Sequence, residues 1–121
     1  MKKERLPHHH GDEKELLRLR EELQEVETFR ATSEIFKQLG DVTRLRLFWI
    51  LCHCEECVIN LSAMLEMSSP AVSHHLRALK QRDLIISNRR GKEVYYRISD
   101  TDRSRLLHET LDRLMSIGCW K

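Results

Sequence analysis

Glycine is scarce in this sequence, and the motifs of enzymes are missing. The 121 residues include four glycines and two prolines. We find no glycine-rich loop of the kind that cradles phosphate, no His-Glu-x-x-His motif and no Ser-His-Asp order. So few glycines in so short a chain argue against a deep catalytic cleft. We therefore predict that the protein is not an enzyme and takes no small organic substrate.

Long apolar runs are also missing. No stretch approaches the roughly 20 apolar residues that a membrane-spanning helix needs. Residues 1–6 lack the apolar segment of a signal peptide. We therefore expect no membrane association and a cytoplasmic location. Disulfides are rare in that reducing compartment, where clustered cysteines more often bind metal or carry out redox chemistry.

Positive charge is unevenly distributed along the chain, although its net value is only +2. Residues 12–34 contain eight acids against four bases, whereas residues 68–97 contain seven bases against two acids. A basic second half suggests a surface for a polyanion. A solvated basic face without a partner is the alternative that charge alone leaves open.

The two ends of the chain have helical patterns with unpaired apolar stripes. Residues 1–11 read as a flexible arm containing His8, His9 and His10, followed by a single domain over residues 12–121. Apolar residues recur at spacings of three and four over 12–39 and again over 100–117, which predicts one helix in each range. Neither stripe can be buried by its own helix, so each needs another helix or a second subunit.

The middle of the chain reads as three helices and a hairpin. A helix capped by Asp41 is followed by a short helix, "LSAMLEM", for which Asn60 is the expected cap. A further helix starts at Ser68 or Ser69 with a proline in its first turn, and runs through "AVSHHLRALKQRD". Two β-prone runs, 84–86 and 94–98, flank the polar segment "SNRRGKE" and predict a hairpin.

This order predicts a mainly α fold with a β-hairpin wing, the winged helix-turn-helix. The second helix of the motif must enter a major groove about 12 Å wide, so its leading positions need short polar side chains. Basic residues farther along it and at the hairpin tip suit phosphate or the minor groove. The predicted DNA-binding residues are Ser68, Ser69, Pro70, Ser73, His74, Arg77, Lys80, Arg89, Arg90 and Lys92. Helix capping by the serines, and solubility from the tip arginines, are the simpler alternatives.

The central segments resemble a known family. "LGDVTRLRLFWIL", "CVINLSAMLEMSSPAVSHHLRALKQRDLI" and "RRGKEVYYRIS" are similar to sequences of the ArsR/SmtB repressors, and the similarity covers about Ile35 to Leu114. The resemblance implies a homodimer joined through helices 12–39 and 100–117. It implies a repressor that binds double-stranded operator DNA. It also implies release of that DNA on binding an inducer, often a metal ion.

The cysteines suggest where the inducer binds. Thiol-type members of the family carry a segment resembling "ELCVCDL", and this chain has "EECVINL", so Cys57 matches the first cysteine while Ile59 replaces the second. Cys52 and Cys54 lie just upstream, and Cys54 with Cys57 forms a Cys-x-x-Cys pair. Thiolates and imidazoles favour Zn²⁺, Cd²⁺ or Pb²⁺. The predicted metal ligands are Cys52, Cys54 and Cys57, with His8, His9 and His10 as further candidates.

A second site of the family, on the last helix, is not expected here. Its matching positions are Asp100, Asp102, Arg113 and Ser116, and only the acidic start survives. His108 and Asp112 are spaced i,i+4 on that helix and are interpreted as a surface hydrogen-bonded pair.

Other functions of the thiols remain open. A disulfide or polysulfide among Cys52, Cys54, Cys57 or Cys119 would make a redox or sulfide sensor on the same fold. Glu55 and Glu56 flank the cluster and disfavour the lowered thiol pKa that such chemistry needs. Cys52 could also be a small core residue. A metal carrier or metalloenzyme is the alternative from a different class of protein.

Overall fold

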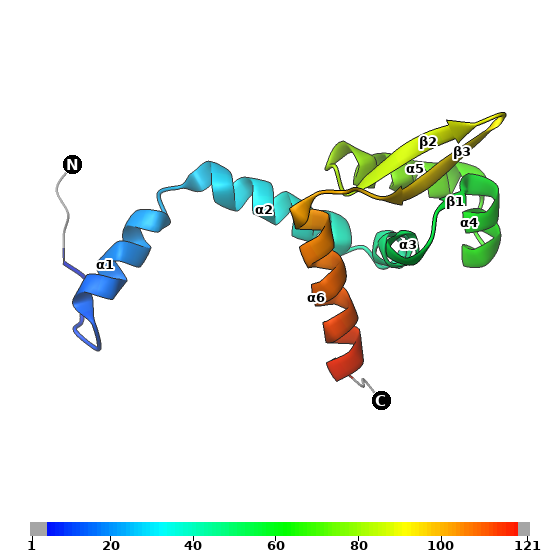
Figure 1. The fold of residues 1–121 in the computed structure, drawn as a ribbon. Coiled ribbons are helices and arrows are strands. Elements are labelled where there is room, and N and C mark those ends of the chain that lie inside the picture. Colours follow the sequence, from blue (N-terminus) through cyan, green and yellow to red (C-terminus); the bar gives the residue numbers. More distant parts are fainter. Residues whose placement is uncertain (1–4, 119–121) are drawn as a thin grey trace. The chain divides into compact units, whose positions relative to one another are not determined.

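The computed structural model describes residues 5–118, so Cys119 lies outside the described residues. The chain divides into two units, one ending at Glu34 and one beginning at Ile35, and each is described by itself. The elements, labelled in Figure 1, are α1 (Glu13–Glu22), α2 (Val26–Leu39), α3 (Val42–His53), β1 (Glu56–Cys57), α4 (Val58–Leu65), α5 (Ser69–Gln81), β2 (Ile85–Arg90), β3 (Glu93–Ile98) and α6 (Asp102–Gly118).

The single helix expected over residues 12–39 is divided into α1 and α2 by a break at residues 23–25. No residue of α1 is buried, so packing does not hold the helix together through the break. The carboxylates of Glu21, Glu22 and Glu25 also gather at the negative end of the α1 dipole, where they are unfavourable. The range is helical as predicted, but it forms two helices and not one.

The core of the second unit lies between α3, α4, α5 and the sheet. Asp41 begins α3 by accepting a hydrogen bond from the Arg44 backbone N–H at 3.0 Å, as the sequence predicts. The buried apolar side chains of this core are Ile35, Leu47, Phe48, Leu51, Leu61, Leu65, Val72, Leu76, Leu79, Leu84 and Ile85. They come from the end of α2, from α3, α4 and α5, and from the start of β2, so these elements form one packed body.

The helix α4 begins earlier than the sequence indicates. Cys57 occupies its N-cap position, without a side-chain capping bond, whereas the expected cap, Asn60, lies inside the helix and donates to Glu56 Oε1 at 2.9 Å. Glu66 ends the helix with a left-handed backbone, φ 53°. That conformation reverses the chain direction within a few residues and brings α5 back across α4. The helix-turn-helix therefore depends on this turn.

The hairpin predicted after α5 is present and belongs to a three-stranded antiparallel sheet of order β1-β3-β2. Arg90 pairs with Glu93 across a two-residue turn, in which Gly91 has φ +63°. The sequence did not indicate β1, which pairs Glu56 with Tyr96 and Cys57 with Tyr95. In Figure 1 the hairpin extends beyond the helices as a wing, with α5 beside it.

The last helix, α6, is fastened to the second unit at its start. Thr101 caps it by accepting from the Ser104 N–H, and the buried Ser104 and Ser99 hydroxyls bond to each other and to the backbone before β2. Leu107 and Leu111 pack against the core. No helix in the described part of the chain is long and apolar enough to cross a membrane.

Candidate nucleic-acid interface

The start of α5 uses its serines partly for the fold itself. Ser68 is the N-cap, and its hydroxyl accepts from the Ala71 N–H at 3.3 Å. The Ser69 hydroxyl lies 3.2 Å from that of Ser62, on the preceding helix. Both serines remain exposed as residues, and Pro70 occupies the first turn. The capping interpretation therefore holds for Ser68, and its contact with DNA stays a prediction.

One face of α5 is buried and the opposite face is open. Val72, Leu76 and Leu79 are fully buried against the core. His74, Arg77 and Lys80 are exposed, and Ser73 is half-buried. Lys80 donates to the hydroxyl of Ser87 on β2 at 2.6 Å, which joins the helix to the wing. A rigid helix that presents imidazole, guanidinium and ammonium groups outward can contact bases and phosphates.

His75 has a structural role at the edge of this face. Its Nδ1 accepts a hydrogen bond from Arg44 Nε at 3.0 Å, and Arg44 also donates to the side chain of Gln38 at 2.6 Å. The pKa of His75 is lowered, mainly by burial and also by the neighbouring charge of Arg44. The Asp41 carboxylate acts in the opposite direction. The neutral imidazole that results is the form that can accept from Arg44.

The three basic side chains predicted at the wing differ in their surroundings. Arg89 and Lys92 are exposed. Arg90 forms an ion pair with Glu55, which precedes β1, and lies over the Tyr95 ring at 4.8 Å from its centroid. Its charge is therefore partly balanced within the protein. Arg89 and Lys92 are better placed to approach a phosphate.

The predicted thiol ligands lie in three different environments. Cys52 is half-buried on α3, Cys54 is exposed at the end of that helix, and Cys57 is buried, with all three in the free thiol form. Burial and the Asp112 carboxylate raise the pKa of Cys52 to about 12. Burial and then Glu56 raise the pKa of Cys54. Among residues 5–118, no group of three close ligand atoms includes these thiols, so their metal site stays a prediction.

The arm histidines belong to the first unit. His8 and His10 stack with ring centroids 5.5 Å apart. Whether they complete a thiol site remains a prediction as well.

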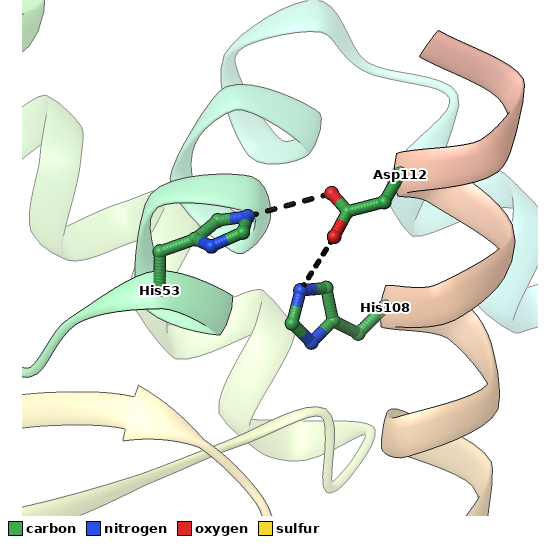
Figure 2. Close-up of side chains that lie close together, drawn as sticks. All are labelled: His53, His108 and Asp112. Carbon is green, nitrogen blue, oxygen red and sulfur yellow. Dashed lines mark ion pairs between the residues drawn. The ribbon is translucent and has the colours of Figure 1, made fainter. Parts of the chain in front are cut away.

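A group that the sequence reading missed lies between α3 and α6. His108 and Asp112 contact each other as their spacing indicates, and His53, at the end of α3, joins them (Figure 2). The sequence signal for its third member is the histidine that follows Cys52 at the end of α3. The pairing itself depends on how α6 packs on α3 and is not visible in sequence spacing.

Comparison with known proteins agrees with this geometry. Residues 41–87 match the family described as bacterial regulatory protein, arsR family. The chain is 37% identical over 93 residues to a transcriptional repressor SmtB homolog of Synechocystis, covering 77% of this chain and 70% of that protein. It is 33% identical over 78 residues to a cadmium resistance transcriptional regulatory protein, a CadC homolog of Staphylococcus aureus, covering 64% of each.

The fold has solved counterparts. The chain is similar to a homodimeric winged helix-turn-helix DNA-binding domain from Mycobacterium bovis, with a TM-score of 0.67, 25% identity, and coverage of 78% of this chain and 86% of that one. These relatives regulate transcription, which confirms the prediction that the protein is not an enzyme. The chain belongs to the ArsR family of winged helix-turn-helix transcriptional regulators.

Proposed function

We propose that the protein is a homodimeric repressor that binds operator DNA and releases it when a thiophilic or borderline metal ion binds. The observation that carries the proposal is the open face of α5 beside the exposed wing tip, both held on one buried core. The proposed target is operator DNA inside the cell, so we place the protein in the cytoplasm.

The DNA-binding part of the proposal rests on complementary shape and charge. The exposed α5 residue His74 suits the major groove and Arg77 the phosphates beside it. The wing residues Arg89 and Lys92 suit the flanking backbone or minor groove. A two-fold dimer would place two copies of α5 about one turn of DNA apart. The homodimeric domain from Mycobacterium bovis supports that assembly.

The inducer part rests on the position of Cys57. This residue belongs to β1, which pairs with the wing strand β3, and is also the N-cap of α4, the first helix of the helix-turn-helix. A ligand held by Cys57 and Cys54 would therefore act on the wing and on α4 together. Thiolates favour Zn²⁺, Cd²⁺ or Pb²⁺, and a cadmium resistance regulator is among the relatives.

The raised thiol pKa values favour metal over oxidants as the inducer. A redox sensor needs a thiolate at neutral pH, and both burial and nearby carboxylates raise the pKa of Cys52 and Cys54. A metal ion can instead displace the proton as it binds. Zn²⁺, Cd²⁺ or Pb²⁺ is accordingly the inducer we propose.

Binding to duplex DNA at several salt concentrations tests the first part. We expect affinity to fall steeply with salt, because phosphate contacts release counterions. Arg77→Ala should weaken binding to all sequences and lower the slope of log affinity against log salt by about 1. Arg105→Ala is the matched control, since Arg105 lies on α6 and is paired with Asp102. Binding that ignores salt, or equal effects of both variants, would contradict the proposal.

Operator release tests the second part. The fully reduced protein, bound to its operator, is titrated with Zn²⁺, Cd²⁺ or Pb²⁺, and release is followed by fluorescence anisotropy. We expect Cys54→Ser to weaken the response at least about tenfold, or 1.4 kcal/mol of coupling, without weakening DNA binding in the absence of metal. An unchanged response of Cys54→Ser and Cys57→Ser would remove these thiols from the sensor.

A further inference from the structure

Three side chains with metal-binding atoms converge between α3 and α6 (Figure 2). His53 Nε2 lies 3.4 Å from one carboxylate oxygen of Asp112, and His108 Nε2 lies 2.9 Å from the other. One ligand atom from each residue lies within 4.8 Å of the other two. The two imidazole rings are perpendicular, with centroids 4.8 Å apart. All three residues belong to the second unit of one chain.

One nitrogen of this cluster lacks a hydrogen-bond partner in the protein. His108 Nε2 is buried, and its approach to Asp112 is an ion-pair contact that leaves this nitrogen without a hydrogen bond. Buried polar atoms in folded proteins normally have such a partner. The His53 ring also lies beside the Trp49 ring, with centroids 4.9 Å apart. The His108 Nε2 atom, which has no hydrogen-bond partner, therefore lies against the Asp112 carboxylate, and His53 contacts the same carboxylate.

We propose that His53, His108 and Asp112 form a binding site for a divalent metal ion of the borderline class, Zn²⁺ in particular. Two imidazole nitrogens and one carboxylate oxygen are a donor set that Zn²⁺ accepts in sites with an open fourth position. At bond lengths of about 2.0 Å, tetrahedral ligand atoms are about 3.3 Å apart. Each imidazole nitrogen is already near this distance from one Asp112 oxygen, His53 at 3.4 Å and His108 at 2.9 Å, but from different oxygens, so one of the two must move to share a single ligand oxygen.

The remaining adjustment is small and the site is accessible. The widest separation in the group, at most 4.8 Å, would have to shorten by about 1.5 Å to reach tetrahedral spacing. The His53 and Asp112 side chains are 44% and 42% exposed, so they can rotate toward an ion and leave the fourth position to water. Soft ions that prefer thiolate are disfavoured by this nitrogen and oxygen set.

The site would connect two parts of the regulator. His53 ends the helix that leads into β1 and α4, whereas His108 and Asp112 lie on the terminal helix. An ion held by all three would fix the direction of α6 relative to the helix-turn-helix within each chain. This consequence for DNA affinity rests on the proposed function, but metal binding itself does not.

Titration with Co²⁺, a spectroscopic substitute for Zn²⁺, tests the site directly. The probe is the reduced full chain in which His8, His9 and His10 are replaced by glutamine and Cys54 and Cys57 by serine, which removes the arm imidazoles and the proposed thiol ligands. We expect one ion per chain to give visible ligand-field bands, and added Zn²⁺ to remove them. His108→Gln and Asp112→Asn should each lower its affinity more than about tenfold. Glu109→Gln, an exposed neighbour on α6, is the matched control. Bands that respond equally to all three variants, or no bands, would overturn the proposal.

A second readout names the ligand atoms and separates this site from the thiols. Zn²⁺ should shift the ¹⁵N resonances of Nε2 in both His53 and His108, and should do so equally in a Cys54→Ser, Cys57→Ser protein. Failure of either histidine to respond would overturn the site. Because neither experiment contains DNA, that failure would leave the proposed repressor function standing, and failure of operator release would leave this site standing.

Discussion

The helix-turn-helix and the terminal helices use their apolar side chains in opposite ways. From α3 to β2 most of the large apolar residues point into one core, in which Phe48, Leu61 and Leu76 are fully buried. Along α1 no residue is buried. On α6 Leu106 and Leu114 are 63% and 55% exposed. The central elements therefore bury most of their apolar surface, and the terminal helices leave most of theirs open.

The difference separates folding from assembly. A packed core gains its stability within one chain, whereas an exposed apolar stripe is stabilised only when another surface covers it. Leu106, Leu114 and Ile117 follow each other at spacings of eight and three, so they share one face of α6. Leu107 and Leu111 lie on the adjoining side of that helix and pack on the core. The free face is the one that a second copy would cover in the proposed homodimer.

The strongest test of the contrast compares two phenylalanines. Phe48→Ala removes a fully buried ring from α3, so we expect the free energy of unfolding to fall by about 3–5 kcal/mol. Phe36 on α2 is 66% exposed, and Phe36→Ala should change it by less than about 1 kcal/mol. Urea denaturation at low protein concentration, where association contributes least, measures both. Similar losses for the two variants would mean that the exposed stripe is part of the fold of one chain.

The second test breaks the assembly and leaves the core intact. Leu106→Glu with Leu114→Glu places two charges on the free face of α6, so we expect the dimer dissociation constant to rise at least about tenfold, or 1.4 kcal/mol. Sedimentation equilibrium gives the constant, and circular dichroism checks that the helices persist. Ser116→Glu, also exposed but on another face of the same helix, is the control and should remain dimeric. A double variant as dimeric as this control would place the interface elsewhere.

The sequence predicted those elements whose causes are local. The Asp41 cap, the serine-led α5 and the Gly91 turn each depend on a few consecutive residues, and the structure has all three. The exposed positions of His74 and Arg77 followed from the spacing of the buried residues between and around them. Periodicity thus gave the orientation of α5 correctly, because one face of it is fully buried.

Features that depend on long-range packing were not predictable in this way. The two-residue strand β1 exists because β3 lies beside it, so Glu56 and Cys57 carry no strand signal of their own. The pairing of Arg90 with Glu55 crosses 35 residues, and that of His53 with Asp112 crosses the whole helix-turn-helix. The break between α1 and α2 was not predicted, because the apolar stripe continues across it in the sequence. Each of these features depends on whether a distant part of the chain packs against the segment.

The smallest expected effect concerns two aspartates that cap helices, Asp41 at the start of α3 and Asp12 at the start of α1. Asp41→Ala should lower the free energy of unfolding by about 1 kcal/mol, because the start of α3 belongs to the core. Asp12 accepts from the Lys14 and Glu15 N–H groups, yet α1 buries nothing, so Asp12→Ala should reduce helicity without moving the denaturation midpoint. Circular dichroism in urea measures both quantities, and equal midpoint shifts would mean that α1 is coupled to the core.

The pH dependence of the same cap sharpens the comparison. The backbone hydrogen bond from Arg44, above all, holds the pKa of Asp41 below its ordinary value of about 3.9. Its stabilising contribution is therefore complete above that ordinary pKa and is lost as the pH falls through the lowered pKa of the folded state. Asp41→Asn keeps a capping oxygen that does not titrate in this range. As the pH falls below that ordinary pKa, the difference in stability between wild type and Asp41→Asn should accordingly shift in favour of the asparagine, because only the aspartate then loses its contribution.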